Sequence, residues 1–153
     1  MTTQRDFEEL LTLFEKNNVR YMIVGGYAVA FHGHPRFTKD IDIFFLGSEE
    51  NIDKVIKSLI DFGFSKTSIS HKLLGKKGNI VQFGIVPARV DLLNTLPGIT
   101  FKKAEQNTLR GPFGETWVNF IGRNDLIKNK KASGRPQDIA DAAILKKRRK
   151  SSK

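Results

Sequence analysis

Cysteine is absent from the 153 residues of the chain. Its absence excludes disulfide bonds, thiolate metal sites and cysteine nucleophiles, so any metal ion must be held by oxygen ligands or by the three histidines. Long hydrophobic runs are also missing, because none approaches the roughly 20 residues of a membrane-spanning helix. The first ten residues, MTTQRDFEEL, lack the order of a secretion signal. We therefore expect a cytoplasmic protein without a membrane partner.

The composition is that of a globular protein, with 39% hydrophobic and 27% charged residues. A chain of this length is typical of one domain with one hydrophobic core. We expect this single domain to span residues 1–145 and a flexible basic tail to follow at residues 146–153.

The net charge of +10 is unevenly distributed along the chain. The last eight residues, KKRRKSSK, hold six basic residues and no acidic ones. Such a segment can attract the phosphate backbone of a nucleic acid. It is equally compatible with a solvated helix end, whose cations suit the negative pole of the helix dipole. The sequence leaves both interpretations open.

Hydrophobic periodicity predicts helices and strands that alternate along the chain. The expected helices cover about residues 7–18, 27–31, 48–63 and 124–131, and a last helix starts at residue 136. The expected strands cover residues 19–24, 40–46, 68–74, 79–86, 89–93 and 117–121, whereas residues 96–114 show no clear pattern. This order predicts an α/β or α+β fold, in which helices flank a mixed β-sheet.

Four residues indicate where helices begin and end. Ser48 is a good N-cap, and Gly63 is expected to end the helix that Ser48 starts. Asn124 is expected to cap the next long helix, and Pro136 suits the first turn of the last one.

Asp40 and Asp42 lie two residues apart in an apolar run that is expected to be a strand. Residues at i and i+2 share one face of a strand, and a buried carboxylate needs a compensating charge. Asp91 interrupts the apolar strand ARVDLL and is the candidate for a third carboxylate. Such oxygen ligands suit Mg²⁺ or Mn²⁺. Taken alone, an Asp-x-Asp pair is also compatible with exposed strand-edge residues or caps.

Gly25 and Gly26 follow the expected strand and precede a short helix. Glycine lets the backbone approach an anion closely, and free N–H groups point outward at a helix N-terminus. A glycine pair alone is more often a tight turn. Combined with two aspartates on the next strand, it is typical of a site that binds a nucleoside triphosphate with a metal ion.

The order of an apolar strand, Gly25-Gly26, a short helix and then Arg36-x-Thr38-x-Asp40-Ile41-Asp42 resembles the signature of the DNA polymerase β nucleotidyltransferase superfamily. Among its members, the chain is most similar to the small nucleotidyltransferases that include the abortive-infection toxin type. Asp91 falls where those proteins carry a third metal ligand. The stretch DLIKNKKASGRPQDIADAAIL is similar to their C-terminal segment.

This resemblance implies a nucleotidyltransferase-like mixed sheet with C-terminal helices, and a Mg²⁺- or Mn²⁺-dependent transfer of a nucleoside monophosphate. The donor would be a nucleoside triphosphate such as ATP, the acceptor a hydroxyl, and pyrophosphate would be released. Asp40, Asp42 and Asp91 would bind the metal ions, and Asp91 would also help to deprotonate the acceptor.

The resemblance also implies how the nucleotide is held. The residues near the nucleotide would be Gly25, Gly26, Thr38, Lys39, Lys130 and Arg135. The two glycines would hold the β and γ phosphates through their backbone, and Lys130 and Arg135 would reach phosphate or acceptor. Asp138 and Asp141 would orient these two basic residues. Many members have Gly-Ser where this chain has Gly25-Gly26, so no serine hydroxyl is available here to hold phosphate.

The acceptor and the partners stay open at this point. RNA such as tRNA, a protein side chain and a small molecule such as an aminoglycoside are all compatible acceptors, and an antitoxin is a candidate partner. One alternative function is a non-catalytic basic module that binds nucleic acid or regulates while keeping the fold. Another is a structural protein with surface aspartates. His32 and His34 have a spacing that could bind zinc, but we expect ordinary loop or acceptor-side residues.

Overall fold

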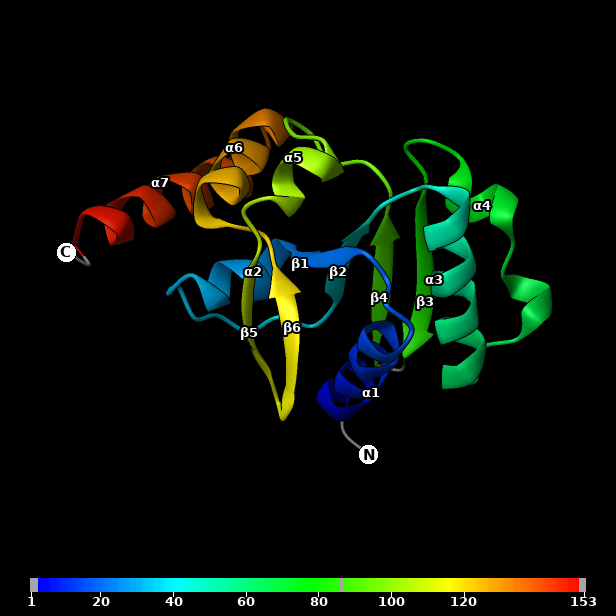
Figure 1. The fold of residues 1–153 in the computed structure, drawn as a ribbon. Coiled ribbons are helices and arrows are strands. Elements are labelled where there is room, and N and C mark those ends of the chain that lie inside the picture. The colour runs from blue at the N-terminus through cyan, green and yellow to red at the C-terminus, as the bar shows by residue number, and fades with distance from the viewer. Residues whose placement is uncertain (1–2, 86, 152–153) are drawn as a thin grey trace.

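Six strands form one mixed β-sheet in the order β3-β4-β2-β1-β6-β5 (Figure 1). The computed structural model describes residues 3–85 and 87–151. The strands are β1 (Tyr21–Val24), β2 (Ile41–Phe45), β3 (Ile80–Ile85), β4 (Ala88–Leu93), β5 (Leu109–Phe113) and β6 (Thr116–Phe120). The helices are α1 (Thr3–Lys16), α2 (Gly25–Phe31), α3 (Glu49–Phe62), the short 3₁₀ helix η1 (Lys66–Ser68), α4 (His71–Gly75), α5 (Phe101–Glu105), α6 (Arg123–Ser133) and α7 (Pro136–Ser151). The expected fold, a mixed sheet flanked by helices, is confirmed.

Strand directions bring two acidic segments side by side. The central pair β1 and β2 is antiparallel, whereas β2 and β4 are parallel, with Asp42 directly opposite Asp91. Val24, the last residue of β1, is the register partner of Asp42 on the other side of β2. The turn from β1 into α2 therefore lies at the same edge of the sheet as Asp42 and Asp91.

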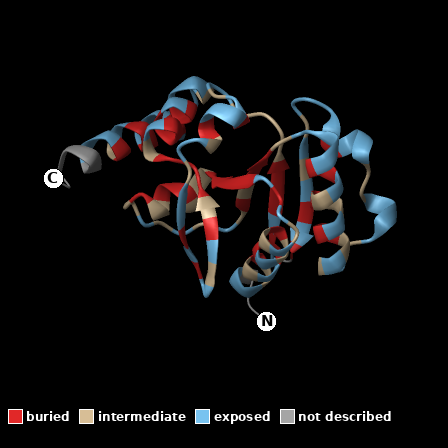
Figure 2. Ribbon diagram, viewed as in Figure 1, coloured by how far each residue is buried: buried red, intermediate tan, exposed pale blue. Residues whose placement is uncertain are grey.

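One hydrophobic core connects the sheet with the helices, and Figure 2 shows its buried positions along the central strands. The apolar stripe of α1 is fully inside, since Phe7, Leu10, Leu11 and Phe14 are buried. Burying such side chains stabilises a fold by about 1.5–3 kcal/mol each. No helix in the described ranges has the length and apolar character needed to cross a membrane.

Several sequence predictions of helix boundaries are confirmed. The Ser48 side chain accepts a hydrogen bond from the backbone N–H of Asn51 and so caps α3. Gly63 ends this helix with a φ of 124°, a conformation that favours glycine. Pro136 is the first residue of α7, as expected. This last helix continues to Ser151, and residues 152 and 153 of the expected tail lie outside the described residues.

The strand predicted at residues 68–74 is wrong. This segment contains the end of η1 and most of α4, because the side chains of Ser65 and Ser70 cap these helices by accepting hydrogen bonds from Thr67 and Leu73. Local side-chain bonds of this kind compete with strand pairing. Asn124 is also not a cap, because α6 begins one residue earlier, after Gly122. In the region without a clear pattern, Thr100 caps α5 and β5 follows.

Candidate active site

Three carboxylates line one cavity of about 620 Å³ near the start of β2, an interior strand of the sheet. Asp42 lies within β2, Asp40 directly precedes this strand, and Asp91 lies on the parallel neighbour β4. The sheet register determines their proximity, because Asp42 and Asp91 are direct partners. The same cavity is lined by Gly25, Gly26, Lys130 and Arg135, which the sequence had also indicated.

The two glycines allow the chain to pass close to the acidic strand. Gly25 has a φ of +68°, and a Cβ atom at this position would overlap the Oδ2 atom of Asp42. A Cβ atom on Gly26 would lie 2.9 Å from Cγ2 and 3.1 Å from Oγ1 of Thr38. Both positions therefore require glycine on steric grounds, and the backbone at Gly25 lies directly against the Asp42 carboxylate.

Arg89 provides the positive charge between two of the carboxylates. Its backbone N–H donates to Oδ1 of Asp40 at 3.0 Å, and its Nη1 lies 3.2 Å from Oδ2 of the same residue. Its Nε donates to Oδ1 of Asp91 at 2.9 Å. The sequence analysis missed Arg89, although its place two residues before Asp91 on a strand puts both side chains on one face.

Asp42 lies in a less favourable environment for a negative charge than Asp40 and Asp91, which contact Arg89. Burial raises the pKa of its carboxyl group to about 6, and the negative charge of Asp91 adds to this effect. The positive charge of Lys130 acts in the opposite direction. Burial and a neighbouring carboxylate therefore both disfavour the charged form of Asp42.

The donor set fits a hard divalent cation, because it consists of carboxylate oxygens and the charged form of Asp42 is disfavoured by burial and by Asp91 in the protein alone. Within residues 3–85 and 87–151, however, no three His, Cys, Asp or Glu side chains are already grouped as metal ligands. The guanidinium of Arg89 contacts Asp40 and Asp91 instead. A metal ion that bound Asp40 and Asp91 would have to displace these contacts of Arg89.

A buried ion-pair network joins α6 to α7 and contributes to the lining of the same cavity. Lys130 is 6% exposed, and its Nζ lies 3.0 Å from Oδ1 of Asp138 and 3.2 Å from Oδ2 of Asp141. Arg135 contacts Asp138 at 2.8 Å, and Arg36 contacts Asp141 at the same distance. Asp138 and Asp141 therefore hold the three basic side chains in place.

The network changes the acidity of Asp138. Burial alone would raise the pKa of its carboxyl group, but hydrogen bonds from Ser133, Lys130 and Arg135 outweigh burial and lower the pKa to about 2. Asp138 is thus ionised at any ordinary pH, and the buried ammonium group of Lys130 keeps a charged partner.

Two of the residues assigned to the nucleotide lie at the margin. Thr38 borders Gly26 but does not line the cavity, and Lys39 is exposed and also lies outside the lining. Arg135 lines the cavity with a largely exposed side chain. The sequence had given no separate role to Arg36, which lines the cavity and anchors Asp141.

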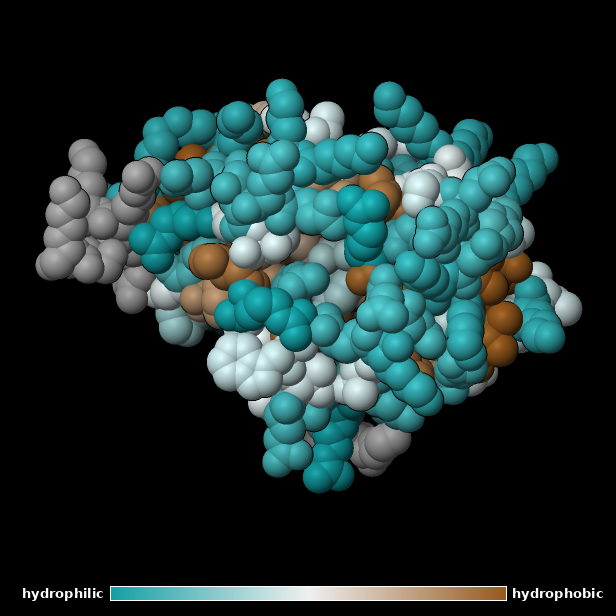
Figure 3. Space-filling view, viewed as in Figure 1, coloured by the Kyte–Doolittle hydropathy of each residue, from teal (hydrophilic) through white to brown (hydrophobic). Residues whose placement is uncertain are grey.

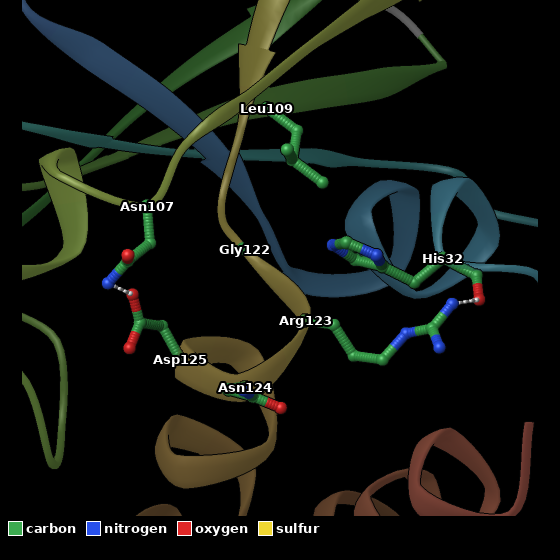
Figure 4. Close-up of a pocket in the computed structure, with 7 residues that line it drawn as sticks. All are labelled: His32, Asn107, Leu109, Gly122, Arg123, Asn124 and Asp125. Atoms are coloured by element: carbon green, nitrogen blue, oxygen red, sulfur yellow. Dashed lines mark hydrogen bonds between the residues drawn. The ribbon is translucent and has the colours of Figure 1, made fainter. Parts of the chain in front are cut away.

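His32 and His34 differ in burial, because His32 is buried and His34 is partly exposed. His32 is buried, and its Nε2 lies 2.7 Å from the carbonyl oxygen of Ile121, so this residue belongs to the core and not to an exposed loop. It lies beside a smaller cavity of about 390 Å³, where Arg123 donates to the carbonyl of His32 and Asn107 donates to Asp125 (Figure 4). None of the three aspartates of the first cavity lines this one.

Comparisons with known proteins agree with this geometry. Residues 4–146 match the sequence profile of a family described as "Nucleotidyltransferase of unknown function (DUF6036)". Among solved structures, the lincosamide antibiotic adenylyltransferase LnuA, in its lincomycin-bound crystal structure, superimposes with a TM-score of 0.56. The match covers 93% of this chain and 95% of that chain at 18% sequence identity, so it shows a shared fold. No curated protein sequence matches the chain.

The family match extends over nearly the whole chain and contains the glycine pair, the three aspartates and the network of α6 and α7. The chain therefore belongs to this nucleotidyltransferase family.

Proposed function

We propose that the protein is a Mg²⁺- or Mn²⁺-dependent enzyme that transfers a nucleoside monophosphate from a nucleoside triphosphate such as ATP to a hydroxyl group. The observation that carries this proposal is the direct opposition of Asp42 and Asp91 on parallel strands, with Asp40 and the Gly25 backbone beside them in one cavity. Membership of the nucleotidyltransferase family supports the class of reaction.

In this proposal, Asp40, Asp42 and Asp91 hold the metal after Arg89 has moved aside. When bound, a divalent ion neutralises charge on the triphosphate and on the leaving pyrophosphate. The pKa of Asp42, which burial and the neighbouring carboxylate raise, supports this role. In this proposal, Asp91 accepts the proton of the acceptor hydroxyl.

The reaction balances without any further reactant. The acceptor oxygen forms a bond to the α-phosphorus, the bond from this phosphorus to the β-phosphate oxygen breaks, and pyrophosphate leaves with the electron pair. The hydroxyl proton passes to the carboxylate of Asp91. Positioning and charge neutralisation supply most of the rate in such transfers.

The remaining residues of the cavity hold the nucleotide in this proposal. Gly25 and Gly26 leave room for the β and γ phosphates next to the backbone, with Thr38 and Lys39 at the margin. Arg135 is exposed enough to meet a phosphate directly, whereas Lys130 is engaged with two carboxylates and contributes mainly its positive charge.

The proposal is tested by incubating the pure protein with each labelled nucleoside triphosphate, Mg²⁺ and either total RNA or cell lysate. We expect label from one nucleotide to be transferred to an acceptor, and this transfer to disappear in the Asp42→Asn variant. Asp61→Asn, an exposed change on α3, is the matched control and should retain transfer. Absence of transfer and of metal-dependent nucleotide binding in the wild-type protein would overturn the proposal.

RNA such as tRNA, a protein side chain and a small molecule remain the candidate acceptors, and an antitoxin remains a candidate partner. The structural neighbour is a lincosamide antibiotic adenylyltransferase, so the shared fold serves a small molecule in that protein. The experiment above separates these acceptors, because the label is found in the RNA, protein or small-molecule fraction.

A second candidate function is a non-catalytic module that binds nucleic acid. The ion pairs of Arg89 with Asp40 and Asp91 favour it, since they neutralise the carboxylates without a metal. This alternative requires RNA binding that weakens steeply with salt and persists in Asp42→Asn. Nucleotidyl transfer by the wild type that is lost in Asp42→Asn supports the enzyme instead, whether or not the two proteins bind RNA.

A further inference from the structure

A second, larger cavity of about 700 Å³ lies next to the candidate active site. It is formed by the ends of β2 and β4, the loop at residues 94–99, and the helices α5 and α6. Its floor is apolar and includes Phe44, Leu96, Ile99 and Phe101. Figure 3 shows apolar side chains at the surface beside α5, surrounded by hydrophilic ones. Cavities of this size and character are typical of sites for small molecules.

Four lysines line the same cavity: Lys77, Lys102, Lys103 and Lys128. They come from three separate parts of the chain, and no acidic side chain lines the cavity with them. All four are exposed, and none forms an ion pair with another described residue. Scattered surface lysines are ordinary, but lysines alone around an apolar floor complement a ligand that is both apolar and negatively charged.

The turn that carries Lys77 is fixed to the sheet by Asn94. The Nδ2 of Asn94 donates to the carbonyl oxygens of Leu74 at 2.8 Å and Lys76 at 2.9 Å. Its Oδ1 accepts a hydrogen bond from the backbone N–H of Gly78 at 3.0 Å. One side chain at the end of β4 thus holds the turn on both sides of Lys77, so this edge of the cavity is formed in advance.

The loop at residues 94–99 separates the two cavities and is fixed to α6. The buried Asn129 donates from Nδ2 to the carbonyl oxygen of Pro97 at 3.1 Å. Gly98 packs so closely that a Cβ atom would lie 2.7 Å from the Cβ of Ala132 and 3.1 Å from the carbonyl oxygen of Lys128. The loop therefore acts as a wall of defined position.

The two cavities adjoin each other at this wall. Leu96 lines both of them. Pro97 and Asn129 line the cavity of the carboxylates, whereas their chain neighbours Gly98 and Lys128 line the lysine cavity. A ligand in the lysine cavity thus lies next to the cavity that holds Asp91, with Leu96 as the shared boundary.

From these contacts we infer that the lysine cavity binds the acceptor of the transfer reaction, a small hydroxyl-bearing molecule with an apolar body and an anionic group. The acceptor role rests on the proposed function, whereas the binding of an apolar anion in this cavity does not. The apolar body lies on the floor around Ile99 and Phe101, and the anionic group is held by the lysines.

The site is tested with 8-anilinonaphthalene-1-sulfonate, an aromatic anion whose fluorescence rises when it binds apolar surface. We expect saturable binding that weakens about tenfold or more in Lys102→Glu/Lys103→Glu, because two charges change sign beside the ligand. Lys66→Glu/Lys72→Glu, which alters two exposed lysines outside the cavity, is the matched control and should bind like the wild type. If Lys102→Glu/Lys103→Glu unfolds α5, the variant Lys77→Glu/Lys128→Glu reverses the other two charges of the cavity, which lie outside α5.

The inference is overturned if Lys102→Glu/Lys103→Glu and its control weaken binding of the aromatic anion equally. It is also overturned if neither of these two variants weakens that binding. The occupant class is checked with a short single-stranded oligouridylate. Oligouridylate that binds through the same lysines, and more tightly than the aromatic anion, would show that the site serves nucleic acid and would overturn the small-molecule assignment. Lysine-dependent binding of the aromatic anion without competition by the oligonucleotide supports it.

The acceptor role is distinguished from the proposed function by two further measurements. Lys102→Glu/Lys103→Glu should keep the thermal stabilisation by ATP with Mn²⁺ while losing transfer of label to the small-molecule fraction of a lysate. Asp42→Asn should lose transfer while binding the aromatic anion like the wild type. Anion binding without any nucleotide effect on the wild type refutes the proposed function and leaves the site. Transfer that is unaffected by the lysine changes refutes the acceptor role and leaves the enzyme.

Discussion

The Nε of Arg89 donates a hydrogen bond to Oδ1 of Asp91 at 2.9 Å, two residues further along the same strand. The Nη1 atom of the same guanidinium lies 3.2 Å from Oδ2 of Asp40. One flexible cation therefore contacts two of the three carboxylates that we propose as metal ligands. In our proposal a divalent ion replaces these contacts when it binds, so we expect Arg89 to compete with the metal.

Removing this competitor should tighten metal binding. In Arg89→Gln the carboxylates lose a neighbouring positive charge, and we expect Mn²⁺ to bind about three- to tenfold more tightly, since the guanidinium is half exposed and partly screened. Titration calorimetry with Mn²⁺ and no nucleotide measures the effect. Arg110→Gln removes a similarly exposed arginine that pairs with Glu15, and should leave Mn²⁺ affinity unchanged. Weaker binding in Arg89→Gln would show that the arginine organises the site and does not compete for it.

The acidic site should reduce the stability of the metal-free protein. Burial and Asp91 raise the pKa of Asp42 from an ordinary 3.8 to about 6. A carboxyl group with a raised pKa in the folded state favours folding when protonated, and this advantage is lost as the pH rises to about 6. Above that pH, Asp42→Asn should therefore be more stable than the wild type, by on the order of 2 kcal/mol.

Urea unfolding without metal at pH 8 and at pH 4 measures this difference. We expect the gain of Asp42→Asn to be largest at pH 8 and to shrink toward pH 4, where the wild-type carboxyl group is protonated as well. Asp61→Asn, an exposed change that removes the partner of Lys57, should show no comparable pH-dependent gain. A destabilised Asp42→Asn at pH 8 would mean that the charged form of Asp42 is held by favourable contacts.

The long elements and the three aspartates could be predicted from the sequence because each rests on a short-range pattern. The stripe of Phe7, Leu10 and Leu11 predicted α1, and Ser48 with Gly63 predicted both ends of α3. The i, i+2 spacing and the interruption of apolar strands indicated the carboxylates. Register could not be read from these patterns, since only strand pairing determines that Asp42 faces Asp91.

Features that depend on contacts far along the chain leave weaker signals in the sequence. A role of Arg89 in the site can be recognised only when Asp40, 49 residues away in the sequence, is known to lie beside it. Residues 68–74 have an apolar content that suits a strand, but Ser70 caps a helical turn that buries Leu74. The lysine cavity joins residues of β2, α5 and α6, which no local pattern connects.

The backbone conformation at Gly25 makes a steric prediction. Gly25→Ala should lose nucleotidyl transfer almost completely, because the new Cβ overlaps Oδ2 of Asp42 and displaces this carboxylate. Gly134→Ala is the matched control, since Gly134 has a similar φ of +72° but no neighbouring atom within 4 Å of a Cβ. It should lose only the roughly 1 kcal/mol of backbone strain that a left-handed alanine carries. Equal activity of the two variants would show that the Asp42 carboxylate is dispensable or free to move.

The ion pairs between α6 and α7 predict how acid affects stability. Hydrogen bonds to Asp138 outweigh its burial and lower the pKa of this carboxyl group from 3.8 to about 2. A lowered pKa in the folded state stabilises the protein above the unfolded value of about 4, and this contribution is lost as the pH falls toward 2. Asp138→Asn should therefore be less stable than the wild type by about 2 kcal/mol at pH 7, and the difference should shrink between pH 4 and pH 2.

The measurement is the free energy of urea unfolding for both proteins across this pH range, with Asp61→Asn as an exposed control. The effect at pH 7 arises because Lys130, itself buried, loses one of its two charged partners and keeps only Asp141. Its position against the carboxylate cavity shifts with that loss, so nucleotide affinity should fall together with stability. A difference between Asp138→Asn and the wild type that stays constant from pH 7 to pH 2 would show that packing, and not the charge of Asp138, joins the two helices.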